Sequence, residues 1–488
     1  MHNRLHFLLA PELLMLSRWW HFGLMAATTW LAVAPASAQD APAEQPPYQG
    51  YKPQSVTLKE CLEAALTHQP RIHAELFSLD SAQITARFLN RLKVVGAVQP
   101  AFGARISQAN LGLTRANAAV AQQVEETFYS VRRAYYTYIY ARRVLDIANP
   151  LELAARRTEN ALLLKKRIGL LFEPVIKMDK LEETMGRPFM DVFFGLAGPN
   201  LANEPLIRKL FRQLEWTTAN ERILTRLHFE HSQIKKKINE AESGARQSIA
   251  LLGEEMGGFG TLGYQPIPSA TSLPMAGPKL NLDELLDLLD SNSGELIQIR
   301  AGRTATELEV RAQRQLAPLR GLVGTFASAT DTKTAPLPSP DRGVEFKPSV
   351  VGFETPANLA GPRRVRVARA NALADRARSV EESTRNLLRL QMRVTHEDYV
   401  ELQADIGNFE TDAKTAKGLF KALTSGMLSV EESDLLTSTG TLLADLEKAH
   451  FDRAVLLADL IRQTGGALEV DIDHWAQPIA EMPAQPTP

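Results

Sequence analysis

Cysteine is almost absent from this sequence, since Cys61 is the one cysteine among 488 residues. A disulfide framework is therefore excluded, and a zinc site built on several thiolates has no ligands. Cys61 lies at helical spacing from Leu58, Leu62 and Leu66. We expect it to be a small residue of an apolar core.

An excess of charge of either sign is also missing. The chain carries 55 Lys and Arg side chains against 56 Asp and Glu side chains, a formal net charge of −1 at pH 7. Because nucleic-acid-binding proteins usually present a basic face, this balance argues against a nucleic-acid partner. The sequence also lacks a G-x-S-x-G motif or another nucleophile signature, so we expect no enzymatic activity and no cofactor.

Long apolar runs occur only near the start of the chain. The apolar stretch 19–33 is followed by Ala36-Ser37-Ala38, the pattern of a signal peptide and its cleavage site. The stretch is short for a membrane span of about 20 residues, and an uncleaved anchor is the alternative. We expect Met1 or Met15 to be the start, and export to the envelope to follow.

The longest regular pattern runs from Gly361 to Gly465. Pro362 can begin a helix, and about 90 Å of helix follows before the next breaker, Gly426. Apolar residues recur every three or four positions, as in a coiled-coil seam. The return helix ends at a glycine C-cap, Gly465-Gly466. The pattern predicts two very long antiparallel helices joined by a tight turn.

Two distant segments, 57–72 and 281–296, align without gaps, so that Pro70 matches Gly294. Each predicts a short amphipathic helix, a breaker, a longer helix and then a long hairpin. The first hairpin is expected to turn near Gly169. The matched order of parts favours a duplication.

These parts resemble the TolC-type outer-membrane efflux proteins. The motifs are the Thr-Leu-x-Glu-x-Leu-x-x-Ala-Leu-x-x-x-Pro opening at Thr57, its second copy, and a Gly-x-x-Ser turn at Gly426. The resemblance implies a mainly α fold: two tandem copies of long antiparallel helical hairpins, which form an α-helical barrel shaft in a homotrimer. It also implies a small β-hairpin contribution to an outer-membrane β-barrel.

The resemblance further implies a function. The chain would be the outer-membrane channel component of a tripartite efflux or secretion system, a passive conduit across the periplasm and outer membrane. Its partners would be two further copies, a periplasmic adaptor protein, an inner-membrane pump and outer-membrane lipid. The sequence then has the following expected organisation: a signal peptide (1–38), a Pro-rich tether (39–56), a first helical-hairpin repeat with an insert near 186–220 (57–256), a linker (257–280), a second repeat with a β-hairpin at 322–355 (281–466) and a flexible C-terminal tail (467–488).

The sequence departs from the family pattern at the membrane strands. Only the stretch 94–102 separates the two helices of the first copy, which is too short for two spanning strands and a turn. This leaves two strands per chain where the family has four. The alternative is therefore a periplasmic coiled-coil interaction protein that has lost the pore. For the insert near 186–220, a small folded unit and a surface loop both remain open.

Acidic residues directly after the predicted hairpin turn are candidates for a periplasmic gate. In the resembled family, acids at this place surround the closed periplasmic entrance. Three copies of a carboxylate near an axis would repel one another, raise their pKa values and attract cations. The alternative is a set of ordinary first-turn acids stabilised by the helix dipole. The candidate gate residues are Glu431, Glu432 and Asp434.

The tips of the two hairpins are the predicted contacts for the adaptor, because the end of a helical hairpin can continue into another coiled coil. The candidate residues are Gly426, Met427, Leu428 and Ser429 in the second hairpin, and Gly169, Leu170, Leu171 and Phe172 in the first.

Three further patterns are better explained without a ligand. The G-x-G-x-x-G stretch 258–263 lacks a preceding strand and a following helix, so we interpret it as a linker. His228 and His231 could begin a metal site, but a solvated helix face explains them better. The tyrosines between Tyr129 and Tyr140 surround their helix and are expected to pack between helices.

Overall fold

The computed structural model of the chain describes residues 51–91, 100–185, 217–274, 277–315, 362–425 and 430–468. It divides into an N-terminal unit, Met1–Lys52, and a unit that comprises Pro53–Pro488. Everything below concerns the second unit, apart from the first residue of strand β1. The predicted signal peptide, most of the insert, the β-hairpin 322–355 and nearly all of the tail lie outside the described residues.

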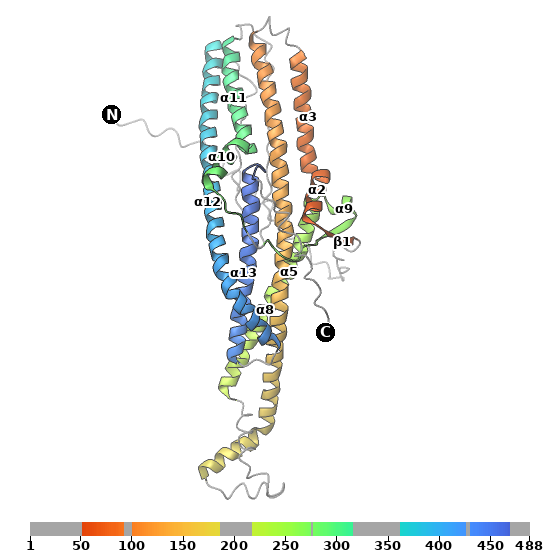
Figure 1. Cartoon of the computed structure of the whole chain (residues 1–488), viewed down its shortest axis with the longest axis vertical. Helices are drawn as coiled ribbons and strands as arrows, with labels where there is room; N and C mark the ends of the chain where they lie inside the picture. The colour runs from red at the N-terminus through yellow and green to blue at the C-terminus, as the bar shows by residue number, and fades with distance from the viewer. Residues whose placement is uncertain are drawn as a thin grey trace, which may run out of the picture. The chain divides into compact units, whose positions relative to one another are not determined.

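The two segments that align in the sequence form helices of equal length (Figure 1). In the first, α2 (Leu58–His68) has 11 residues and α3 (Pro70–Arg91) has 22. In the second, α10 (Leu282–Asn292) has 11 residues and α11 (Gly294–Gln315) has 22. Each pair is followed by a long helix pair, α5 (Pro100–Met185) with α8 (Thr218–Glu255), and α12 (Arg363–Ser425) with α13 (Val430–Gln463).

The short helices begin at polar caps. The Thr57 side chain accepts a hydrogen bond from the Glu60 backbone N–H, and the Glu60 carboxylate accepts one from the Thr57 N–H, which completes a capping box. These bonds to Thr57 lower the pKa of Glu60. In the second copy, Asn281 accepts from the Asp283 N–H at 3.0 Å.

The return helices end in the same way in both copies. Gly257 follows α8 with φ +109°, and Gly465 follows α13 with φ +65°. A Cβ atom on Gly257 would lie 2.4 Å from the Cβ of His68, the last residue of α2. A Cβ atom on Gly465 would lie 2.4 Å from the carbonyl oxygen of Asn292, the last residue of α10. Each return helix thus closes on the short helix of its own copy, and only glycine fits there.

The predicted turn near Gly169 is wrong, because α5 continues through this residue to Met185. An isolated glycine costs a helix only about 1 kcal/mol relative to alanine, and it still makes both backbone hydrogen bonds. The stronger breaker, Gly186-Arg187-Pro188, comes directly after α5 ends.

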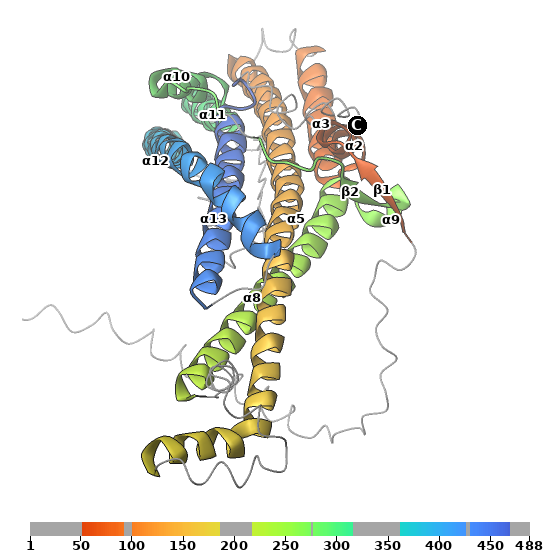
Figure 2. The same ribbon diagram turned by 60° about the horizontal axis from the view of Figure 1, so that its bottom comes forward.

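The helices pack side by side in two sets that share α5 and α12. In one half of the unit, α3 contacts α5, α5 contacts α11, and α11 contacts α12; in the other half, α8 contacts α5, α5 contacts α13, and α13 contacts α12 (Figures 1 and 2). Helix α12 is therefore one edge in both halves, and α3 or α8 is the other.

The largest apolar cluster lies where the two halves meet. It includes Cys61, which is fully buried as predicted, and burial raises the pKa of its thiol to about 12. Tyr135 is buried as well, and its hydroxyl accepts a hydrogen bond from the Ala270 N–H at 3.2 Å. Its neighbours Tyr129 and Tyr136 are also buried, so the expectation of packing between helices is confirmed for these tyrosines.

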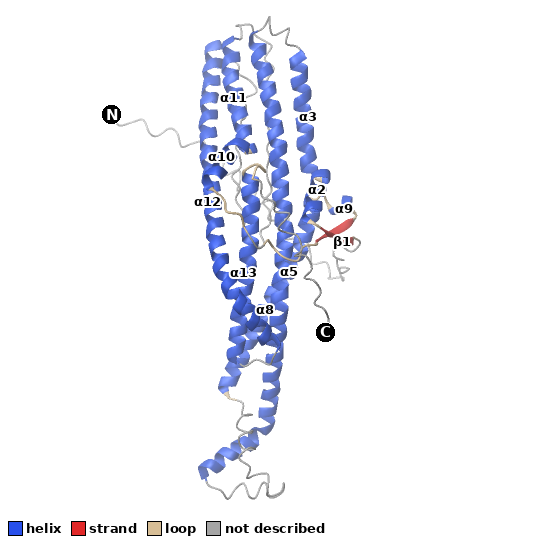
Figure 3. Ribbon diagram, viewed as in Figure 1, coloured by secondary structure: helices blue, strands red, loops and turns tan. Residues whose placement is uncertain are grey.

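A small sheet that the sequence did not predict lies beside this cluster. Strand β1 (Lys52–Val56) pairs with β2 (Tyr264–Pro268), and the short helix α9 (Phe259–Leu262) precedes β2 (Figure 3). The glycine-rich stretch 258–263 therefore leads into a strand inside the linker between the two copies.

The linker then crosses to α10 as an extended segment (Figure 2). Side chains of α12 and α13 bind its carbonyl groups: Arg453 donates to Pro274 at 2.7 Å, Gln403 to Gly277 at 3.0 Å and Tyr399 to Pro278 at 2.9 Å. Among the residues that the structure describes, no helix is both long enough and apolar enough to cross a membrane.

Candidate functional site

The candidate gate acids lie in the first turn of α13, and one of them is held by a neighbouring helix. The Asp434 carboxylate forms an ion pair with Arg226 of α8 at 2.6 Å, and Arg226 also binds Glu230 at 2.9 Å. The hydrogen bond to Glu230 and the charge of Asp434 raise the pKa of Arg226. Glu432 is exposed, and the side chain of Glu431 lies outside the described part.

Sequence reasoning missed Arg226. The one local signal was its i,i+4 spacing from Glu230 on α8. Its pairing with Asp434, which joins α8 to α13, comes from the fold.

The structure describes only one of the two predicted hairpin tips. Residues 426–429 lie outside the described ranges. Residues 169–172 have helical backbone inside α5, so they do not form a tip.

The histidine pair lies against two carboxylates of α5. His228 Nδ1 lies 2.9 Å from Glu159 Oε1, and His231 Nδ1 lies 2.6 Å from Glu159 Oε2. On the other side of the ring, His231 Nε2 lies 3.1 Å from Glu152 Oε1. The predicted solvated face describes His228 but is wrong for His231, whose side chain is buried.

These four side chains do not converge on one point, because the two nitrogens of His231 bind carboxylates on opposite sides. Within the described ranges, no group of three or more His, Cys, Asp or Glu side chains is arranged to hold a metal ion. Although burial raises the pKa of Glu159, the hydrogen bonds from His228 and His231 outweigh it and hold that pKa below its ordinary value.

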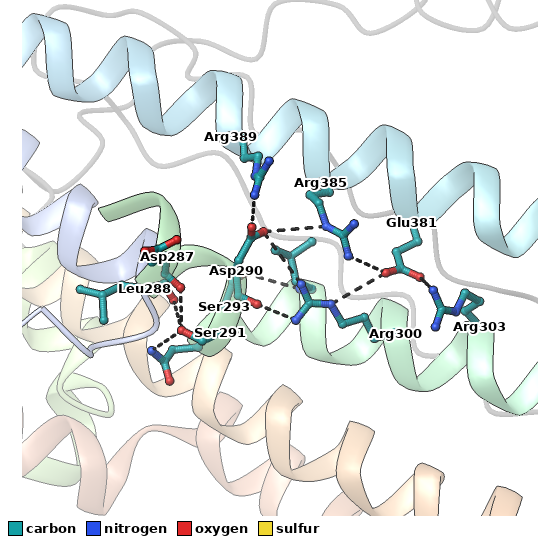
Figure 4. A network of polar contacts seen from close by, with 12 residues as sticks. Asp287, Leu288, Asp290, Ser291, Ser293, Arg300, Arg303, Glu381, Arg385 and Arg389 are labelled. Carbon is teal, nitrogen blue, oxygen red and sulfur yellow. Dashed lines mark hydrogen bonds and ion pairs between the residues drawn. The ribbon is translucent and has the colours of Figure 1, made fainter. Parts of the chain in front are cut away.

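A network of arginines and acids joins α10 and α11 to α12 (Figure 4). Glu381 of α12 is almost fully buried, and it binds Arg303 at 2.8 Å and Arg385 at 2.8 Å. Asp290 at the end of α10 pairs with Arg389 and lies 3.9 Å from Arg300. This network fixes the edge helix α12 against α10 and α11 of the same copy of the repeat.

The outer face of α3 exposes large apolar side chains at helical spacing. Phe77 is 71% exposed, Ile84 67% and Phe88 60%. Helix α12, at the other edge of the same set, also exposes an apolar row, in which Leu390 is 59% and Val394 52% exposed. Exposed rows of this kind usually mark an interaction surface.

The aligned repeat indicates what normally covers such a face. Residues 77, 84 and 88 of α3 align with Ala301, Leu308 and Ala312 of α11. Ala301 and Ala312 are buried, and α11 packs against α5 beside them, where Gln108 donates to the Ala305 carbonyl at 3.0 Å. On α3 the equivalent side has no helix of the described chain packed against its large apolar residues.

The two exposed rows lie at the same height along the helices. Asn90 of α3 bonds Asn110 of α5, and Gln108 of α5 bonds Ala305 of α11. Two residues further along α11, Glu307 binds Arg378 of α12 at 3.1 Å. The path from Asn90 to Arg378 rises by about 6 Å, because Gln108 and Glu307 each lie two residues above the preceding contact. Phe77, thirteen residues below Asn90, and Val394, sixteen residues below Arg378, therefore lie at about the same height.

The chain is similar to known proteins in structure but not in sequence. No protein-family model matches the sequence, and no curated protein is similar to it in sequence. The chain is similar to the solved open-state structure of the MtrE outer-membrane channel from Neisseria gonorrhoeae, with a TM-score of 0.54 and 13% identity over 84% of this chain and 89% of that one.

Two other solved channels are similar to a comparable extent. The outer-membrane channel OprN matches with a TM-score of 0.51 and 12% identity, over 89% of this chain and 95% of that one. CusC matches with a TM-score of 0.52 and 11% identity, over 87% of this chain and 96% of that one. These similarities and the helix pairs described above confirm the predicted mainly α architecture. The chain has the fold of the TolC-type outer-membrane channel proteins, as the resemblance in its sequence indicated.

Proposed function

We propose that this protein is the outer-membrane channel component of a tripartite efflux or secretion system, through which cargo passes without catalysis by the channel itself. The observation that carries the proposal is the open set of helices α3, α5, α11 and α12, whose two edges both expose apolar rows at one height. Because the two edges of this set differ, the α3 edge of one copy can pack against the α12 edge of the next copy in a head-to-tail contact.

The repeat supports a particular closure. Within the chain, α11 packs against α5, and the aligned helix α3 needs an equivalent of α5 on its open side. That equivalent is α12, the long helix that follows α11 as α5 follows α3. A copy-to-copy contact of α3 with α12 is heterologous, and such contacts close into a ring when the rotation is right. The family resemblance favours a homotrimer, in which the ring would enclose a tunnel.

Burial of the edge residues would stabilise the ring. Each Phe or Leu side chain transferred from water contributes about 1.5–3 kcal/mol, and the same row recurs at every seam.

The remaining assignments follow from the resemblance and complete the proposal. The predicted hairpin 322–355 would form the outer-membrane strands, and the tip 426–429 would contact a periplasmic adaptor linked to an inner-membrane pump. The first-turn acids Glu431 and Glu432 would line the entrance, with Asp434 tied back by Arg226. The expected location is the outer membrane and the periplasm.

The second candidate function is a periplasmic coiled-coil interaction protein without a pore. The observation that favours it is the short stretch 94–102, which leaves no room for membrane strands in the first copy. The same ring could form in this case, but it would not conduct.

Single-channel conductance of the purified protein in planar bilayers, with the oligomeric mass measured on the same sample, tests the proposal. Discrete conductance steps from a trimer, blocked by divalent cations, are the expected result. A folded helical trimer that gives no steps would overturn the conduit and support the interaction protein.

A further inference from the structure

The cluster of Glu152, Glu159, His228 and His231 plays no part in the proposed conduit. It lies between α5 and α8, where His231 is 6% exposed and each ring nitrogen faces a carboxylate oxygen. Glu152 and Glu159 are seven residues, or about two turns, apart on α5, so the imidazole links two separate positions of α5 to one position of α8.

The hydrogen bonds of His231 require a count of protons. A neutral imidazole has one nitrogen that donates and one that accepts, whereas an ionised carboxylate only accepts. Glu159 is ionised, because the bonds from the two histidines hold its pKa low, so the Nδ1–H of His231 donates to it. The 3.1 Å contact between Nε2 and Glu152 then needs one more proton, placed either on Nε2 or on the carboxyl group.

We propose that this additional proton, shared between His231 and Glu152, is the joint that fastens α8 to α5. When the proton is present, α8 is held at both turns of α5. When it leaves, the Nε2 lone pair faces an ionised carboxylate, the contact becomes repulsive, and at this site α8 keeps only its bonds to Glu159.

The joint also reaches α13. Arg226, five residues before His231 on α8, binds Asp434 in the first turn of α13. Loosening α8 at His231 therefore frees the segment that carries this ion pair, so the proton state of the cluster affects how the start of α13 is held. The inference does not rest on the conduit role. The charged groups that surround His231 are Glu152 and Glu159 from α5, His228, Glu230 and Arg226 from α8, and Asp434 from α13, which reaches α8 through Arg226.

Hydrogen exchange of the full-length protein, measured by mass spectrometry on peptides that cover 222–240, tests the joint. Exchange is compared at about pH 6 and about pH 8.5, on either side of the range in which histidine changes charge, after correction for the intrinsic exchange rates. We expect the corrected protection of the wild type to fall by about tenfold at the higher pH, as for the loss of one hydrogen bond to a charged group.

Two variants separate the joint from a general effect of pH. In Glu152→Gln, the amide N–H₂ donates to the neutral Nε2, so the contact no longer needs the additional proton and protection should be equal at both pH values. In Lys236→Gln, the matched control, an exposed charge of α8 outside the cluster is removed and the dependence should stay as in the wild type. Equal protection of the wild type at both pH values would overturn the proposal, and so would an unchanged dependence in Glu152→Gln. The exchange readout needs only the folded protein, so a protein that does not conduct ions can still pass this test.

Discussion

The two copies of the repeat have the same helices but different surroundings. In the second copy, α11 is covered on both sides, by α5 and by α12. In the first copy, α3 is covered by α5 on one side and exposes Phe77, Ile84 and Phe88 on the other. The larger side chains lie on the uncovered copy, where the covered copy has Ala301 and Ala312. A solvent-exposed face usually carries polar residues, so the difference supports a partner for α3 beyond the described helices.

Aspartate at the equivalent positions 77 and 301 should show the largest difference between the two copies. Ala301→Asp places an unpaired charge at a buried position of α11, and we expect a loss of about 3–5 kcal/mol in the free energy of unfolding. Phe77→Asp lies on the open face of α3, so the folded protomer should change by less than about 0.5 kcal/mol while the oligomer dissociates. Urea unfolding followed by circular dichroism, together with mass by light scattering, measures both effects.

If Phe77→Asp destabilised the protomer as much as Ala301→Asp, the two faces would be equivalent within one chain and the comparison would fail.

The ion network of Figure 4 distinguishes the second copy further, because Asp290 and Arg300 align with Leu66 and Leu76 in the first. Glu381→Ala would leave the guanidinium groups of its arginine partners without their buried counter-charge, at a cost of about 3 kcal/mol. Glu382→Ala, at the exposed neighbouring position, is the control and should be nearly neutral. The melting temperature of each variant tests this prediction. Equal melting temperatures for Glu381→Ala and Glu382→Ala would mean that the network contributes nothing to stability.

Gly257 and Gly465, where each return helix meets the short helix of its own copy, test how similar the two copies are. Gly257→Ala and Gly465→Ala each force a side chain into a left-handed conformation and onto the end of a short helix. We expect each substitution to lower the free energy of unfolding by about 2 kcal/mol, with nearly the same loss in the two copies. Gly407→Ala is the control, since its Cβ meets nothing within 4 Å and alanine favours the helix by about 1 kcal/mol. Unequal losses at Gly257 and Gly465 would show that the two closures are not equivalent.

The features that the sequence predicted correctly depend on local patterns. Heptad spacing and the cap at Gly465 predicted the pair α12 and α13, and the aligned segments predicted α2, α3, α10 and α11. The missed features depend on contacts between distant residues. The ion pair of Asp434 with Arg226, the burial of His231 and the pairing of β1 with β2 are settled only when the helices are packed together.

The error at Gly169 has a different cause. Glycine is a turn signal, but its effect on a long helix is small, and the proline-containing breaker follows only at residues 186–188.

Disulfide cross-linking of Phe77→Cys with Val394→Cys tests the copy-to-copy seam most directly. The native Cys61 is fully buried and does not compete for the new thiols. Oxidation is expected to give covalent dimers and trimers on a denaturing gel, because a disulfide requires Cα atoms within about 7 Å. Each single variant, and the pair Phe229→Cys with Val394→Cys, should give no trimer. Folded double-cysteine protein that stays monomeric on the gel after oxidation would contradict the account.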